Sequence, residues 1–235
     1  MNPTNQQEQP KQKGKFIVFE GPDGMGKSKQ SQLALDYLIE ERVIDTVLTK
    51  EPGSSLLQFT GDLREMIFHR PYSSSLDQVE QGLLLFIDHY HNARWVRELT
   101  DHGRNVISDK WLYSQYCYNS IKPVSQETAM DLYEQFEPLQ IQPDLVIIMG
   151  LDKEEAYRRI EKREKEGEKK TQAKHKLWAV DDYIGELIKN YATLYHGLVN
   201  DEIPTITVVP KNEETPEEVF EKYIKGQINL TLEGE

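Results

Sequence analysis

Short apolar runs alternate along the chain with longer segments in which apolar residues recur at helical spacing. The apolar runs at residues 16–19, 46–49, 105–108, 145–149 and 205–209 predict strands, and such continuous runs are typical of strands buried on both faces of a parallel sheet. Helical segments cover about 28–41, 56–68, 76–102 and 216–228; Gly103 ends the third and Thr215 caps the fourth. Strands that alternate with helices predict an α/β protein, a three-layer α/β/α fold around a five-stranded parallel sheet.

Length and composition set the domain boundaries and exclude several classes of protein. Residues 1–14 are polar and predict a disordered tail, whereas residues 15–230 predict one domain with enough apolar content for a core. No apolar run approaches the ~20 residues that span a bilayer. The single cysteine, Cys117, excludes an internal disulfide framework and, with the lack of an apolar leader, favours a cytoplasmic protein without membrane partners. The net charge of −12 disfavours binding to a nucleic-acid polymer.

The strongest motif binds phosphate. Residues 21–28 read G-P-D-G-M-G-K-S, which fits G-x-x-x-x-G-K-[ST] and lies between a predicted strand and a predicted helix. This predicts a P-loop NTPase fold, in which backbone amides and the helix N-terminus face a nucleotide such as ATP. Lys27 would pair with the β/γ-phosphates and Ser28 would bind Mg²⁺. The predicted ATP-binding residues are Gly21, Asp23, Gly24, Met25, Gly26, Lys27, Ser28 and Lys29.

A second candidate for the metal site is Asp109, which ends an apolar strand. Carboxylates at the carboxyl ends of strands in open α/β sheets usually meet ligand. Asp109 is therefore predicted to hold Mg²⁺ through water or to orient an acceptor phosphate, the alternative being a cap for the helix that follows Trp111.

Four further segments, taken with the loop, resemble the thymidylate kinase family of nucleoside monophosphate kinases. Phe19-Glu20 precedes the loop, as in that family's E-G-x-D-G-x-G-K-S, and residues 49–54 (T-K-E-P-G-S) resemble its T-R-E-P-G-G. Asp109-Lys110-Trp111 resembles its D-R-Y, with Ser114 and Tyr118 at the spacing of its later Ser and Tyr, and Pro143-Asp144-Leu145 resembles its P-D-L. The resemblance implies phosphorylation of dTMP or a related deoxynucleoside monophosphate by ATP with Mg²⁺, in a homodimer.

The resemblance also assigns residues to the acceptor side. Asp23 and Glu51 would lie near the acceptor phosphate, Lys110 would take the place of the family's catalytic Arg, and Tyr118 would lie under the sugar. Arg64, in the following helix, is predicted to reach the acceptor phosphate. Ser114 and Gln115 are predicted to bind the substrate, Gln115 through a base edge.

The base-reading position departs from the family pattern. Phe86 is the candidate for stacking on the base, and the family carries an Arg four residues later. Here that position is Tyr90 or, in a register shifted by one, His89. Because an unpaired buried polar edge costs about 1–3 kcal/mol, this difference should alter the choice of base.

A basic stretch predicts a lid over ATP. Residues 153–176 have a local net charge of +4, and the lid is placed at about 162–178. Met25 supplies no charge inside the P-loop, so the chain resembles the family members that take their catalytic cations from the lid. That resemblance implies Arg158, Arg159 and Arg163 as candidates. The alternative is a charged helix held by pairs such as Glu154–Arg158.

Two other functions remain open from the sequence, although the absence of N-K-x-D disfavours a GTPase switch. A deoxynucleoside kinase would share the P-loop and could use Glu51 as the general base for a sugar hydroxyl. An NTP-binding module without turnover would need only the P-loop.

Overall fold

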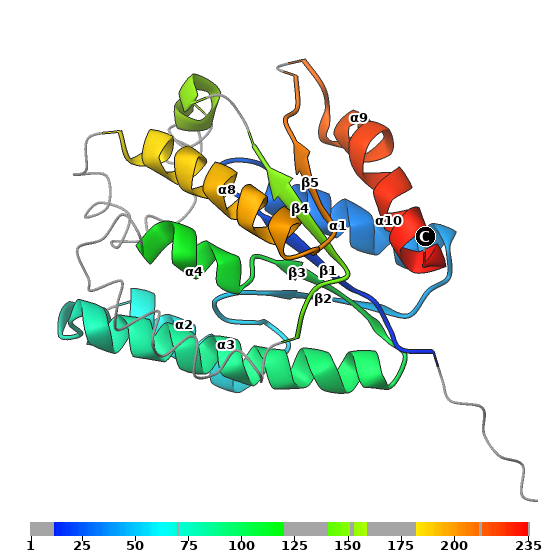
Figure 1. The fold of residues 1–235 in the computed structure, drawn as a ribbon. Coiled ribbons are helices and arrows are strands. Elements are labelled where there is room, and N and C mark those ends of the chain that lie inside the picture. Colours follow the sequence, from blue (N-terminus) through cyan, green and yellow to red (C-terminus); the bar gives the residue numbers. More distant parts are fainter. Residues whose placement is uncertain are drawn as a thin grey trace, which may run out of the picture.

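A computed structural model shows the five-stranded parallel sheet that the apolar runs predict (Figure 1). It describes residues 12–69, 71–119, 141–150, 153–158, 182–211 and 213–234. The sheet order is β2-β3-β1-β4-β5, and each pair of neighbours is parallel. The strands are β1 (Phe16–Glu20), β2 (Thr46–Lys50), β3 (Asn105–Asp109), β4 (Leu145–Met149) and β5 (Thr205–Val208).

Helices cover both faces of the sheet, as a parallel sheet requires. They are α1 (Lys27–Asp36), η1 (Tyr37–Glu41), α2 (Gln58–Phe68), η2 (Tyr72–Ser74), α3 (Gln78–Asp101), α4 (Leu112–Asn119), α8 (Tyr183–Asn200), α9 (Pro216–Val219), η4 (Phe220–Ile224) and α10 (Lys225–Glu233). α2 and α3 run along one side, at the bottom of Figure 1, whereas α1, α9 and α10 lie on the other. The sequence pattern did not predict α8, which lies between the predicted lid at about 162–178 and the strand at 205–209.

The central strand shows why a continuous apolar run forms this architecture. All five residues of β1 are buried. Phe16 and Val18 pack with Ala93 and Val96 of α3, whereas Ile17 and Phe19 pack with α1 and α8 on the other face. Successive side chains of a strand point to opposite faces, so one strand contributes to two cores.

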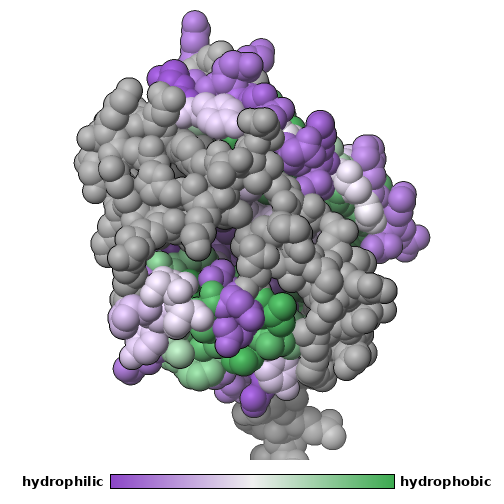
Figure 2. All heavy atoms as spheres, turned by 90° about the vertical axis from the view of Figure 1, so that its left-hand side faces the viewer, coloured by the Kyte–Doolittle hydropathy of each residue, from purple (hydrophilic) through white to green (hydrophobic). Residues whose placement is uncertain are grey.

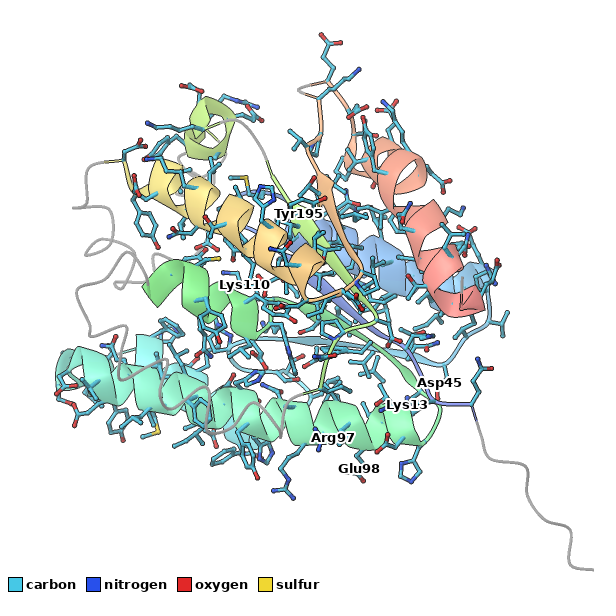
Figure 3. All side chains as sticks on the ribbon, in the orientation of Figure 1. Lys13, Asp45, Arg97, Glu98, Lys110 and Tyr195 are labelled. Atoms are coloured by element: carbon cyan, nitrogen blue, oxygen red, sulfur yellow. The ribbon has the colours of Figure 1, made fainter. Side chains whose placement is uncertain are left out.

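The sheet brings the functional segments together at its carboxyl edge. β1 ends at Glu20 and leads into the P-loop, β2 ends beside Glu51, and β3 ends at Asp109. Lys110 lies where β3 leads into α4, whereas Lys13 and Asp45 mark the opposite edge (Figure 3). Because β1 lies between β3 and β4, the P-loop occupies the position in the sheet where ligands of open α/β folds bind.

The ends of the domain differ slightly from the predicted boundaries. The Gly14 N–H already donates to the Thr100 carbonyl (2.8 Å), and Lys13 pairs with Asp101 (3.2 Å), so chain contacts begin before Lys15. The C-terminal helical segment extends to Glu233, past the predicted end at 228. Within the described ranges, no helix is both long enough and apolar enough to cross a bilayer.

Candidate active site

The P-loop has the backbone geometry that an anion site needs. Gly21, Gly24 and Gly26 have φ values of 130°, 86° and 90°, which residues with a Cβ rarely adopt. A Cβ on Gly21 would also collide with the Met149 carbonyl of β4. Gly26 begins α1 without any side-chain cap, so the start of the helix is open toward an anion.

The side chain of Lys27 folds back onto the P-loop. Its Nζ donates to the Pro22 carbonyl at 2.7 Å, and the side chain is buried. Burial, assisted by repulsion from Lys110, lowers the pKa of Lys27 to about 8. A phosphate would replace one neutral carbonyl acceptor with charged oxygens, so the ammonium is placed to bind a polyanion.

Ser28 and Asp109 meet across the mouth of the loop. The Ser28 hydroxyl donates to Asp109 Oδ2 at 2.5 Å, while Asp109 Oδ1 is buried and has no partner among the described residues. Hydroxyl and carboxylate oxygens are hard ligands, and Mg²⁺ usually takes only one or two protein groups besides water and phosphate. This donor set therefore fits Mg²⁺. In the part of the chain that is described, no cluster of three or more His, Cys, Asp or Glu residues could hold a metal alone.

Lys110 connects the β3–α4 turn with the P-loop. Its Nζ lies 2.9 Å from Asp23 Oδ1 and 4.8 Å from the centroid of the Tyr118 ring, whose hydroxyl is 3.5 Å away. Attraction to Asp23 and hydrogen bonding outweigh burial, so the pKa of Lys110 is raised well above its usual value. The three predicted acceptor-side residues Asp23, Lys110 and Tyr118 therefore form one cluster.

Glu51 and His89 form a second cluster, at the end of β2. The His89 Nδ1 lies 3.0 Å from both carboxylate oxygens of Glu51, and both side chains are buried. The imidazole packs edge-on against Trp111, and its Nε2 is buried without a partner in the described structure. Of the two possible registers, the shifted one is therefore the register that brings a side chain to Glu51.

Asp88 and Asn92 extend this buried cluster along α3. Asp88 Oδ1 accepts from the Gly53 N–H (3.0 Å), and Oδ2 accepts from Asn92 Nδ2 (3.2 Å). Burial, with repulsion from Glu51, raises the pKa of Asp88 to about 8. Asp88 thus holds the turn that follows Glu51.

The other predicted acceptor-side residues have partners of their own. Arg64 donates to the Pro52 carbonyl (2.7 Å), and Gln115 donates to the Leu85 carbonyl of α3 (3.2 Å). Phe86 is half-buried, and Tyr90 lies under the guanidinium of the exposed Arg94, 6.0 Å from the ring centroid.

The remaining predicted residues lie at the edges of the site. Met25 belongs to the hydrophobic core, and Lys29 pairs with Glu217 of α9 at 3.1 Å. Arg158 makes two bonds to Glu155, of 2.6 and 2.7 Å, within the helical residues 153–158. Arg159, Arg163 and the lid at about 162–178 lie outside the described residues.

Glu20 is a residue that the sequence motifs did not assign to the site. It is fully buried and accepts the Ser114 hydroxyl (2.6 Å), so Ser114, predicted to bind substrate, is bonded to this carboxylate. The available signal was a charged residue ending an otherwise apolar strand, directly before the motif.

A loop open to an anion, a pair of oxygen ligands for a metal and buried cations, joined at the carboxyl edge of a parallel sheet, define a P-loop nucleotide kinase. A sequence model of the family described as thymidylate kinase matches residues 19–202. The chain belongs to the thymidylate kinase family. This family phosphorylates dTMP to dTDP with ATP, and the chain is a nucleoside monophosphate kinase.

Individual relatives agree with the family assignment. The chain is 35% identical to a thymidylate kinase of Caldicellulosiruptor saccharolyticus, over 63% of this chain and 70% of that protein. It is 29% identical to a probable thymidylate kinase of Methanococcus vannielii, over 88% and 91% of the two chains. The crystal structure of thymidylate kinase from Ehrlichia chaffeensis superimposes with a TM-score of 0.63 at 21% identity, covering 92% of this chain and 99% of that one. These comparisons confirm the predicted family and the predicted fold.

Proposed function

We propose that this enzyme transfers the γ-phosphoryl group of Mg²⁺-bound ATP to a deoxynucleoside monophosphate, with dTMP as the first acceptor to test. The observation that carries the proposal is the approach of Ser28 to Asp109 at 2.5 Å, beside a loop whose lysine bonds, among the described residues, to a carbonyl. Those groups are what a nucleoside triphosphate and its metal would engage.

The chain's own residues would act mainly through charge and position. Phosphoryl transfer brings two polyanions together, and cations must offset their repulsion. Lys27 would bind the phosphates of ATP, and Lys110, released from Asp23, the phosphate of the acceptor. Ser28 and Asp109 would hold Mg²⁺, which neutralises charge on the phosphates. Arg158, Arg159 and Arg163 are proposed to supply further positive charge from the lid.

The acceptor nucleoside would lie between α3 and α4. Phe86, Gln115 and Tyr118 face this acceptor in our proposal, while Arg64 and Glu51 lie toward its phosphate and sugar. Since the cluster around Glu51 contains an imidazole where the family has a guanidinium, the base preference is expected to differ from strict selection of thymine. Thymine remains the reference base.

A panel of acceptors tests the proposal. The purified enzyme would be incubated with ATP, Mg²⁺ and each of dTMP, dUMP, dCMP, dAMP and dGMP, and with the matching nucleosides. Formation of a diphosphate from at least one monophosphate is expected. Turnover of thymidine alone would support a deoxynucleoside kinase instead, and ATP binding without any turnover would support a binding module. The contacts disfavour Glu51 as a base for a sugar hydroxyl, because both of its oxygens lie 3.0 Å from His89 Nδ1.

A homodimer is the second part of the proposal. Val79, Leu83 and Ile87 lie four residues apart on α3 and are 48%, 40% and 43% exposed. The stripe continues at His91, which contacts the half-exposed Phe59 of α2 (4.9 Å between ring centroids). Figure 2 shows apolar surface gathered in the lower part of the molecule, at the end where α2 and α3 lie. Such a stripe suits a second copy of the chain.

The oligomeric state can be measured by light scattering coupled to size exclusion. Wild type is expected at twice the chain mass of 27.4 kDa. Leu83→Glu should shift it toward the monomer, whereas Val199→Glu, a change at an exposed apolar residue of α8, should not.

The acidic net charge and the single cysteine further favour a cytoplasmic enzyme that handles small nucleotides rather than nucleic acid.

A further inference from the structure

Glu20 is the most fully bonded carboxylate beside the site, and the proposed mechanism does not use it. Oε1 accepts the backbone N–H groups of Trp111 (2.8 Å) and Ser114 (3.2 Å). Oε2 accepts the hydroxyls of Ser114 (2.6 Å) and Tyr191 (3.2 Å). Since Trp111 and Ser114 flank the first turn of α4, a strand residue caps this helix from outside, where a negative charge is favourable.

The capped turn holds a strained residue. Lys110 has φ = 74°, a left-handed conformation that is unfavourable for a residue with a Cβ. The peptide groups on both sides of Lys110 are fixed. Its N–H donates to the Phe19 carbonyl (2.9 Å), and its carbonyl accepts from the Ser108 hydroxyl (2.5 Å). The next N–H, that of Trp111, is the one that Glu20 accepts.

The consequence of this backbone conformation is the direction of the Lys110 side chain. In this arrangement Nζ reaches Asp23 in the P-loop at 2.9 Å. Sparsely populated backbone conformations persist only where surrounding contacts over-determine them. Glu20 supplies one of the three contacts, and it comes from the same strand end that opens the P-loop.

We propose that Glu20 is a positioning residue for phosphoryl transfer: it holds the β3–α4 turn so that Lys110 faces the P-loop and the acceptor phosphate. Glu20 touches no substrate and acts through Lys110. The Tyr191 hydroxyl adds a tie to α8, so three segments of the active site are held by one carboxylate. The inference rests on the proposed role of Lys110.

The length of the Glu20 side chain and its charge can be varied separately. The groups that face the Glu20 carboxylate are Lys27 of α1, Lys110 of the turn, Tyr113, Ser114 and Cys117 of α4, and Tyr191 of α8. Burial raises the pKa of Glu20 to about 7. A proton on Oε2 is compatible with both hydroxyl partners, because hydroxyls also accept, and it leaves Oε1 free for the two backbone N–H groups. The cap therefore needs the oxygen at the correct distance rather than the charge.

Two single substitutions test this separation. Glu20→Gln keeps an oxygen in place for Trp111 and Ser114, whereas Glu20→Asp keeps the charge but withdraws the carboxylate by one methylene. We expect kcat to fall by about 10-fold or more in Glu20→Asp and by less than about 3-fold in Glu20→Gln. The KM for ATP should change little in either. Tyr191→Phe, which removes one hydroxyl partner but no contact to the turn, serves as the control and should stay close to wild type. An equal or larger loss in Glu20→Gln would overturn the inference.

A double-mutant cycle with Lys110→Met distinguishes positioning from general destabilisation. If Glu20 acts through Lys110, Glu20→Asp should cost little further activity in the Lys110→Met background, whereas independent effects would multiply. Multiplying effects would overturn the inference but leave the role of Lys110 intact. Unchanged kcat in Lys110→Met alone would overturn the proposed role of Lys110 itself. The midpoint of thermal unfolding is measured for each variant, and all assays are run below it. Loss of folded enzyme then does not contribute to the differences in kcat.

Discussion

The P-loop region and the buried cluster at the end of β2 neutralise their charges in opposite ways. At the P-loop, Lys27 has only a backbone carbonyl, and Asp109 keeps one buried oxygen without a partner in the described structure. At β2, the carboxylate of Glu51 is occupied by His89, and both oxygens of Asp88 accept hydrogen bonds. The first region keeps charged groups available for a ligand. In the second, the carboxylates are bonded within the protein, although His89 Nε2 and Asn92 Oδ1 are buried without partners among the described residues.

This difference separates the P-loop residues, which match the family motif, from the residues at the base-reading position, which depart from it. Phosphate groups are common to every substrate, and residues 21–28 fit the P-loop motif, although Lys110 takes the place of a family Arg. The β2 cluster contains Glu51, which we propose to lie near the acceptor, and His89, which takes the place of a family arginine in one of the two predicted registers. An imidazole makes one hydrogen bond to a carboxylate, whereas a guanidinium makes two parallel ones. After pairing with the carboxylate, the two side chains therefore present different groups for further hydrogen bonds.

The largest expected effect is at the P-loop. Lys27→Met removes the buried ammonium that would meet the β/γ-phosphates, and kcat should fall by about 10³-fold or more. Steady-state kinetics with dTMP and ATP measures this loss. Lys189→Met changes an exposed lysine on α8 and should have full activity. Full activity in Lys27→Met would disprove the assignment of the phosphate end.

A smaller but more specific effect is expected at the metal ligands. Asp109→Asn keeps an acceptor for Ser28 but removes the negative charge that attracts Mg²⁺, so we expect kcat to fall by about 10- to 100-fold. The Mg²⁺ concentration at half-maximal rate should rise in the same variant. An unchanged Mg²⁺ requirement would show that Asp109 serves only as a cap.

The features that the sequence could predict, and those that it could not, follow the same division between the two regions. Fold and phosphate site could be predicted because each depends on local signals: continuous apolar strands, a glycine-rich loop between strand and helix, and an acid at a strand end. The pairing of Glu51 with His89 depends on how α3 packs against β2, 38 residues apart in sequence, and no local spacing distinguishes His89 from Tyr90. Ser114 illustrates the same limit, since only the fold shows that its hydroxyl bonds to Glu20. The sequence analysis assigns no element to the segment of α8, which follows the predicted lid at about 162–178.

Substitution of His89 tests whether the β2 cluster is self-sufficient. His89→Ala leaves the buried Glu51 carboxylate without its partner, and the free energy of unfolding should fall by about 1–3 kcal/mol. Urea denaturation at pH 7 measures the loss. His89→Arg restores a donor to Glu51 and should recover part of the stability while moving the acceptor preference toward dTMP. The interpretation would be wrong if His89→Ala were as stable as wild type, or if His89→Arg left the ranking of the acceptors unchanged.

The smallest effect concerns the proton on Asp88. Its pKa is about 8 in the folded protein, because of burial and the nearby Glu51, against 3.8 for an exposed Asp side chain in water. Between these values the folded protein holds a proton that the unfolded chain has released, so rising pH favours unfolding. The stabilisation is complete below about pH 4 and is lost as the pH rises through 8. Asp88→Asn imitates the protonated form: its oxygen can accept from Gly53, and its amide can donate to Asn92 Oδ1, which is buried without a partner among the described residues.

The variant should therefore match wild type at about pH 4 and become progressively the more stable of the two as the pH rises, by more than about 1 kcal/mol near pH 8. Urea midpoints at pH 5, 6, 7 and 8 measure the difference. The pKa of Glu20 is also raised, to about 7, but this carboxyl is common to both proteins and cancels in the comparison. If the urea midpoints of the two proteins changed in parallel with pH, Asp88 would be ionised in the folded protein. The β2 cluster would then carry a buried charge that its neighbours, Arg64 among them, must balance.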